Sequence, residues 1–182
     1  ADANTDPTPT PPIGGGNGAP YGTTPDGTPV VPAQAPSGYP LNILEEDALG
    51  GHTYDRHINK SEEYLKARIT GERPNVPFIG GPGLKRAGSF TSLEAAEKLV
   101  NSTISANQAE VDAFAKSSIP WSLSTKYIFK TFAQATGYEG YAPNPDTYPV
   151  MRSTYSVMIE LRRTNSSPKG YYVRSARPFN ED

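Results

Sequence analysis

Apolar residues recur at helical spacing in the first part of the region that begins at residue 41. In segment 41–49, positions 41, 43, 44, 48 and 49 are apolar with acids between them, which is typical of a short amphipathic helix that two glycines then end. A second helix is expected from Ser61, because Glu62 and Glu63 would lie in its first turn, where the helix dipole favours acids.

Two further helices are predicted after a loop over 71–88, a segment with three prolines and five glycines. The segment 91–94 (TSLE) matches a capping box, and the apolar positions of 93–101 then share one helical face. A second cap pattern at 105–108 precedes another apolar face over 111–115. Helices are therefore expected to fill the first part of the folded region.

The period of the pattern then changes to two, the period of a half-buried strand. Val157, Ile159 and Leu161 alternate with longer or charged side chains. Three strands are predicted, over 126–132, 155–163 and 171–177. The polar segment 164–170 would join the last two as a hairpin loop, and Pro178 would end the third. Helices followed by antiparallel strands indicate an α+β domain.

The first forty residues differ in composition from the rest of the chain. They hold ten prolines, seven glycines and no lysine or arginine. Such a segment buries too little apolar surface to offset the entropy lost on ordering. We interpret residues 1–40 as a Pro/Gly-rich linker without the features of a signal peptide, and residues 41–182 as one domain.

The charge and cysteine content of the domain narrow its class. The linker contains three acids, which leaves 16 acids (19 − 3) against 17 bases and a net charge near +1. This is far from the charge of a general nucleic-acid binder, so any anion site must be local. The chain has no cysteine, which excludes disulfides and thiolate metal ligands. No apolar run approaches the roughly 20 residues of a membrane span.

Both histidines of the chain, His52 and His57, lie in one short segment close to the acids at 45–47. A metal site is the first hypothesis, but neither HExxH nor another zinc-ligand spacing is present. Five residues on one helix rotate by about 140°, so the two imidazoles would point apart. The sequence therefore predicts neither a metal site nor a cofactor.

Proton transfer beside an anion is the remaining chemistry that these residues allow. A neutral imidazole accepts a proton, and Lys60, Lys66 and Arg68 follow the histidines as candidate phosphate ligands. Together these groups suit RNA cleavage, in which the ribose 2′-hydroxyl attacks the adjacent phosphorus; DNA lacks that hydroxyl. The residues alone leave another interpretation open. In that interpretation each histidine is a helix cap or a surface residue, and the lysines and the arginine are solvated surface charges.

Three segments resemble, in order, the bacterial ribonuclease A-like toxin domains, which lie at the C-termini of contact-dependent growth inhibition and other polymorphic toxins. The first contains GGHT at 50–53, RHI-x-KS at 56–61 and L-x-x-R at 65–68. The other two are SFTSLEAAEKLV at 89–100 and GYYVRSARP at 170–178. The resemblance covers about 45–178. It implies a fold like pancreatic ribonuclease, with N-terminal helices packed on a bent antiparallel sheet, a cleft between lobes and, here, no disulfides.

The resemblance also implies catalytic residues. It carries the family's histidine and arginine onto His57 and Arg68, and the threonine and tyrosine of the last strand onto Ser175 and Arg177. Ser175 keeps a hydroxyl that can hold a phosphate oxygen. Arg177 stays protonated and is no proton donor, so the general acid is left open.

The general acid is to be sought among His52, Lys60 and a water molecule. His52 and Lys60 are expected to help bind the substrate. A second departure from the family pattern is Glu46, which stands where a histidine is usual.

These expectations combine into one functional hypothesis. The chain is predicted to be a metal-independent endoribonuclease toxin that leaves a 2′,3′-cyclic phosphate and inhibits competing bacteria, with transfer RNA among its candidate substrates. The resemblance implies a cognate immunity protein, a delivery protein upstream of the linker, secretion or injection by the producer, and action in the target-cell cytoplasm. The alternatives are a non-catalytic binding or adhesion module on a proline-rich stalk, and a metal-dependent nuclease.

Overall fold

The computed structural model describes residues 41–71 and 84–181, so the predicted linker 1–40 and most of the loop before residue 84 lie outside the description. The described part is α+β, as predicted. Its helices are α1 Ile43–Ala48, α2 Thr53–His57, α3 Glu62–Gly71, α4 Leu93–Ala106, α5 Gln108–Ala115 and the short 3₁₀ turn η1 Trp121–Leu123. Its strands are β1 Arg86–Ser89, β2 Thr125–Thr131, β3 Gly137–Tyr141, β4 Val150–Thr154, β5 Ser156–Arg163 and β6 Tyr171–Phe179.

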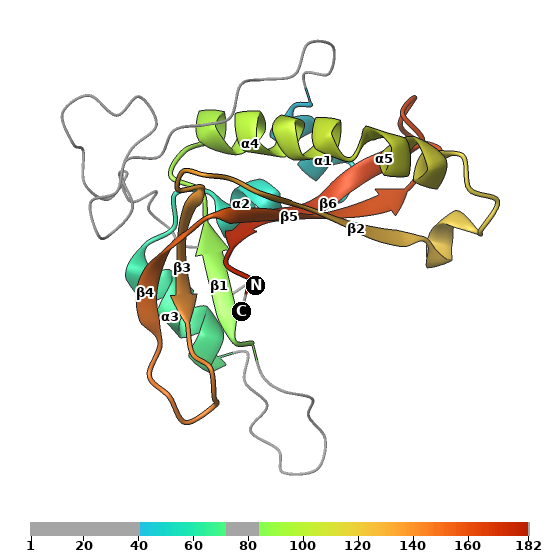
Figure 1. Ribbon diagram of the computed structural model, residues 1–182. Coiled ribbons are helices and arrows are strands. Elements are labelled where there is room, and N and C mark those ends of the chain that lie inside the picture. The colour runs from blue at the N-terminus through green and yellow to red at the C-terminus, as the bar shows by residue number, and fades with distance from the viewer. Residues whose placement is uncertain (1–40, 72–83, 182) are drawn as a thin grey trace.

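The strands form two antiparallel three-stranded sheets. We call the sheet with order β2-β5-β6 the large sheet and the sheet with order β1-β3-β4 the small sheet. In Figure 1, α4 lies along one side of the large sheet, and the small sheet with α3 extends away from the other side. Strand β6 contacts both β1 and β3, so the two sheets meet at the C-terminal strand.

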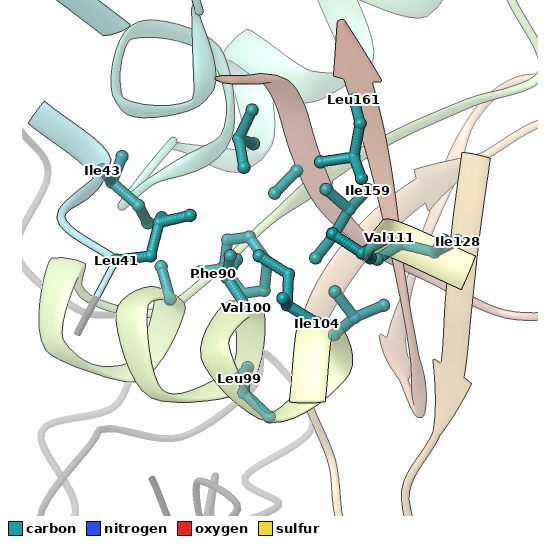
Figure 2. Close-up of a cluster of buried hydrophobic side chains, with 14 of the residues drawn as sticks. Leu41, Ile43, Phe90, Leu99, Val100, Ile104, Val111, Ile128, Ile159 and Leu161 are labelled. Carbon is teal, nitrogen blue, oxygen red and sulfur yellow. The ribbon is translucent and has the colours of Figure 1, made fainter. Parts of the chain in front are cut away.

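The main core lies between α4 and the large sheet (Figure 2). Leu99 and Val100 of α4 are fully buried, and they share one cluster with Ile128, Ile159 and Leu161 of the sheet. The strand residues are spaced by two along β5 and lie on one face, as the sequence pattern predicts. Each side chain of this size contributes about 1.5–3 kcal/mol by leaving water.

A second cluster joins α3 to the small sheet. Leu65 and Ile69 of α3 are fully buried against Tyr138 of β3. The hydroxyl of Tyr138 donates to the carbonyl oxygen of Lys60 at 2.6 Å, ahead of the helix. This packing fixes the direction of α3, which carries Arg68.

One extra residue in β6 determines which of its side chains face the core. Neighbouring residues of β5 pair with β6 residues that are two apart, which makes Arg174 the additional residue of a β-bulge. Val173 and Ala176 are three positions apart and would face opposite sides of a regular strand, yet both are fully buried in the same cluster. The bulge thereby leaves Ser175 and Arg177 together on the opposite face.

Most of the predicted elements are present, but several boundaries differ. The capping box predicted over 91–94 would make Thr91 the N-cap, but the N-cap of α4 is Ser92, whose Oγ accepts from the backbone N–H of Ala95 at 3.1 Å. The cap pattern at 105–108 does not start a helix at 105, since α4 continues to Ala106. Pro178 does not end β6, because an edge strand tolerates a residue without an N–H.

Five of the described elements were not predicted: α2, η1, β1, β3 and β4. Strand β1 lies in the predicted loop over 71–88 except for its last residue, Ser89. Strand β3 contains two glycines and a glutamate, and β4 has an arginine at its centre, so neither shows an alternating apolar pattern. Among the described helices, none is long and apolar enough to cross a membrane.

Candidate active site

Helix α2 carries a histidine at each end and is held by a carboxylate of α1. Asp47 accepts hydrogen bonds from the backbone N–H groups of Thr53 at 2.9 Å and Tyr54 at 2.8 Å, which otherwise lack helical partners. Gly51 allows this approach, because an added Cβ would lie 2.7 Å from Asp47 Oδ1 and 2.6 Å from the carbonyl oxygen of Val173. The glycine before the histidines therefore has a packing role.

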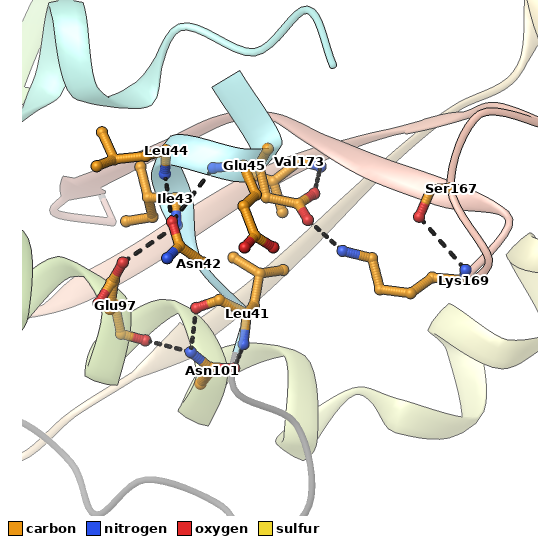
Figure 3. A network of polar contacts seen from close by, with 11 residues as sticks. Leu41, Asn42, Ile43, Leu44, Glu45, Glu97, Asn101, Ser167, Lys169 and Val173 are labelled. Carbon is orange, nitrogen blue, oxygen red and sulfur yellow. Dashed lines mark hydrogen bonds and ion pairs between the residues drawn. The ribbon is translucent and has the colours of Figure 1, made fainter. Parts of the chain in front are cut away.

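Polar contacts fix α1 against α4 and β6 (Figure 3). The side chain of Asn101 bonds both the N–H and the carbonyl of Leu41, at 2.8 and 3.1 Å. The buried carboxylate of Glu46 forms an ion pair with Lys169 and accepts from the N–H of Val173 at 2.6 Å. Glu46, which departs from the expected histidine, thus anchors β6 directly before its bulge.

His57 ends α2 and is tied to β1. Its Nδ1 lies 2.9 Å from the carbonyl oxygen of Gly88. Because a carbonyl oxygen only accepts, Nδ1 carries the proton, and the lone pair of the neutral ring is on Nε2. Burial lowers the pKa of His57 well below its usual 6.5, and the positive charges of Arg68 and Arg177 lower it further. The imidazole is therefore neutral near pH 7 and basic at Nε2.

Gly88 also sets the distance between β1 and the C-terminal strand. An added Cβ on Gly88 would overlap the carbonyl oxygen of Pro178 in β6. The residue that accepts the His57 hydrogen bond is thus in direct contact with the neighbour of Arg177. This close crossing brings the helix-borne and strand-borne parts of the candidate site together.

Ser175 and Arg177 are two residues apart in β6, so their side chains lie on the same face of the strand. Ser175 is 7% exposed, and Arg177 is half-buried. Burial lowers the pKa of Arg177 from its usual value, and the charges of Arg86 and Arg68 lower it further. Cations held this close together favour an anion between them.

Arg68 belongs to the same group of charges. It lies in the last turn of α3 and is 8% exposed. Its charge lowers the pKa of His57, of His52 and of Arg177, which places Arg68 within electrostatic range of all three. The structure therefore brings Arg177 within electrostatic range of His57 and Arg68, from which it is far apart in sequence.

His52 lies beside His57, contrary to the expectation that the two rings point apart. Their centroids are 6.2 Å apart, with 43° between the ring planes. The expectation was wrong because His52 precedes α2 as its N-cap, with φ −150°, so the helical rotation does not apply. Burial lowers the pKa of His52, as do the charges of Arg56 and Arg174. Its backbone N–H donates to the carbonyl of Arg174 at the bulge, at 2.9 Å.

The ammonium of Lys60 contacts α3, and its backbone N–H contacts β1. Its ammonium lies 5.3 Å from the ring centroid of Tyr64 in α3, and its backbone N–H donates to Ser89 Oγ at 3.0 Å. The side chains whose charges lower the pKa of His57 are instead Arg68, Arg177 and His52.

Glu139 is a residue near the site that sequence reasoning missed. Its side chain is fully buried in β3, where one carboxylate oxygen accepts from Nε and Nη2 of Arg152 at 2.8 and 2.7 Å. Burial raises its pKa, although Arg152 and Arg86 oppose this. Glu139 pairs in register with Gly88, and its charge acts on Arg177. The only signal in the sequence was an acid inside the segment GYEGY.

Two imidazoles and two guanidinium groups within electrostatic range of one another suit proton transfer at an anionic substrate. Within residues 41–71 and 84–181, no group of three or more histidine, aspartate or glutamate side chains has the arrangement to hold a metal ion. The fold and these residues together define a domain of the ribonuclease A type, without cysteine.

The comparisons with known proteins agree with this class. The chain belongs to the family described as the bacterial CdiA-CT RNase A domain, whose model matches residues 51–178. It is similar to a chain in the crystal structure of a CdiA-CT/CdiI complex from Y. kristensenii, with 26% sequence identity and a TM-score of 0.55. That similarity covers 70% of this chain and 98% of the other. A search of curated proteins finds no match.

Proposed function

We propose that this chain is a metal-independent endoribonuclease toxin that cleaves RNA by attack of the ribose 2′-hydroxyl. The observation that carries the proposal is the state of His57. Its proton is held on Nδ1 by Gly88, its pKa is lowered by burial, and two guanidinium groups act on it. Family membership supports ribonuclease activity as the reaction class.

In the proposed reaction His57 Nε2 removes the proton of the 2′-hydroxyl, and that oxygen forms a bond to the adjacent phosphorus. The bond from phosphorus to the 5′-oxygen breaks, which leaves a 2′,3′-cyclic phosphate and a free 5′-hydroxyl. Arg68 and Arg177 stabilise the charge that grows on the phosphoryl oxygens, and Ser175 donates a hydrogen bond to one of them. A carbonyl-fixed tautomer needs no rearrangement before proton transfer.

The leaving 5′-oxygen must receive a proton, and Arg177 stays protonated throughout. The imidazolium formed at His57 has its ring 6.2 Å from that of His52. We assign the second proton transfer to the protonated form of His52, which its lowered pKa makes a stronger acid, or to a water molecule beside it. Lys60 lies over Tyr64, which makes it a weaker candidate for this role.

The biological setting follows from the family. The structurally similar CdiA-CT chain was crystallised with its partner CdiI, so we propose a cognate immunity protein for this chain as well. The cationic groups around His57 would suit a partner with an acidic surface. Residues 1–40 would connect domain 41–182 to a delivery protein, which brings it from the producing bacterium into the cytoplasm of a competitor.

The test is incubation of the purified chain with RNA in the presence of a chelator. The proposal predicts fragments that end in 2′,3′-cyclic phosphate, with no cleavage of the same sequence made as DNA. Loss of cleavage in chelator would favour a metal-dependent nuclease instead. Intact RNA under all conditions, together with unchanged toxicity of His57→Ala and Arg68→Ala variants in cells, would favour a binding or adhesion module.

A further inference from the structure

The face of the large sheet that carries Ser175 and Arg177 also carries two exposed aromatic rings. Tyr127 and Phe129 of β2 are 48% and 47% exposed, although rings of this size usually contribute to cores and interfaces. Ile128 between them is buried in the main core, so both rings point away from α4. In Figure 1, α4 lies on the other side of β2.

Strand register aligns these rings with the candidate catalytic residues. Tyr127 pairs with Glu160, which pairs with Ser175. Phe129 lies in the neighbouring row, which passes through β5 to Arg177. Because neighbouring strands are about 4.7–4.9 Å apart, the backbone of each aromatic residue lies about 10 Å from that of the residue at the other end of its row. The electrostatic effect of Tyr127 on Arg177 agrees with this placement.

The rings continue into a series of alternating aromatic and cationic side chains. The ring of Phe129 makes an edge contact with Phe179, at 5.9 Å between centroids. The guanidinium of Arg86 lies 5.9 Å from the ring of Phe179 and 5.4 Å from that of Tyr141. Arg152 then lies 3.7 Å from the Tyr141 ring. Apolar planes and positive charge thus extend from the large sheet onto the small sheet.

The partner that matches this face has flat apolar groups spaced along a flexible anionic backbone. Bases of single-stranded RNA stack on exposed aromatic side chains while cations bind the phosphates, and sheet faces serve this role in other RNA-binding domains. Tyr127 and Phe129 are two residues apart on one strand, so their rings present successive stacking positions. Base-paired RNA cannot offer its bases in this way.

We propose that Tyr127 and Phe129 form a stacking platform for unpaired bases next to the phosphate that is cleaved. This inference rests on the proposed ribonuclease function and specifies its substrate as single-stranded RNA. Since every base has a flat face, the platform selects for unpaired structure more than for sequence. Cleavage should therefore concentrate in loops and single-stranded ends.

The test measures binding of a short 2′-O-methyl oligo-adenylate, which has no free 2′-hydroxyl and stays intact. Tyr127→Ala and Phe129→Ala should each weaken binding roughly tenfold, the equivalent of about 1.4 kcal/mol. Tyr127→Phe keeps the ring and should bind as the unmodified chain does. Tyr148→Ala is the matched control, because Tyr148 is 74% exposed and lies against Lys66 of α3.

A second probe separates the loss of base stacking from other causes of weaker binding. An oligonucleotide with the same backbone and abasic residues should bind equally well to the unmodified chain and to the Tyr127→Ala and Phe129→Ala variants. Unchanged affinity of those variants for oligo-adenylate would overturn the proposal and assign the face to a protein partner. An equal loss of affinity for the abasic probe in these two variants would also overturn the proposal. Because the first probe is never cleaved, binding without any RNA cleavage would refute the ribonuclease function and leave the platform standing.

Discussion

The two faces of the large sheet are built by the same three strands but differ in the burial and in the polarity of their side chains. The face toward α4 is apolar and closed, with Ile128 and Ile159 in the main core. The opposite face carries charged and aromatic side chains, among them Phe129 and Arg177, and is partly open to solvent. The bulge at Arg174 keeps the two sets apart. Stability and proposed function are thus separated by strand register, and substitutions on the two faces should have different consequences.

The largest effect on stability is expected on the closed face. Ile159→Ala should lower the free energy of unfolding by about 2–5 kcal/mol, because the cavity it leaves among fully buried neighbours cannot close. Met158→Ala, one residue earlier and half-buried on the other face, should cost much less. Urea unfolding of both variants measures the difference. Equal losses of unfolding free energy in the two variants would contradict the distinction between a closed and an open face.

Among substitutions on the open face, the largest effect on activity is expected at Arg177. Arg177→Gln should lower kcat/KM by roughly 10²–10³, the range seen when one donor to a developing oxyanion is removed. Arg163→Gln is the control, since Arg163 donates to the carbonyl of Ile119 at 2.5 Å, away from the histidines. The comparison uses RNA cleavage rates of both variants. A similar loss in the control would mean that positive charge alone matters, wherever it lies.

The contact between the two sheets can be disturbed at Gly88. An added methyl group would overlap the Pro178 carbonyl, so Gly88→Ala should force the backbone apart and cost about 1–3 kcal/mol of stability. Gly71→Ala is the matched control, because nothing lies within 4 Å of an added Cβ there. Thermal unfolding reports stability and the NMR signals of His57 report the site. Identical behaviour of the two variants would argue against a close crossing of β1 and β6.

The smallest effect is expected in the pH dependence of stability. His57 has a folded-state pKa below its unfolded value of 6.5, so its contribution is fully present above pH 6.5 and is lost as the pH falls toward the folded-state pKa. His57→Asn removes this titration and keeps a side-chain N–H for Gly88. Stability curves from pH 7 to 5 should therefore be flatter in the variant. Parallel curves for the two chains would mean that the pKa of His57 is the same in the folded and the unfolded state.

The sequence predicted the parts of the fold that have periodic patterns. The amphipathic helix α4 and the alternating strand β5 follow directly from the spacing of apolar residues. Strand β3 has no such pattern because its buried residues include a charged one, Glu139, whose burial depends on Arg152 from the next strand. A single sequence does not show such a pairing. The extra residue at Arg174 is equally invisible until the register is known.

The sequence suggested candidate site residues, whose roles stay predictions, but not how those residues are arranged. The family resemblance selected His57 and Arg68, and the structure brings both together with Arg177. The helical rotation argument failed for His52 because it assumed one continuous helix where the structure has a cap. The role of Gly88 as hydrogen-bond acceptor and spacer arises from tertiary contacts alone.

The most direct test of the account is the pH dependence of kcat/KM for RNA cleavage, in the unmodified chain and in His57→Asn. Because kcat/KM reports the free enzyme, the acidic limb of the profile should have its midpoint below 6.5, where the buried imidazole of His57 takes up a proton. The Asn variant should fold and should lose that limb together with most of the activity, typically 10²–10⁴-fold. A folded Asn variant that cleaves RNA at the unmodified rate, or a midpoint at or above 6.5, would contradict the assignment of His57 as the base.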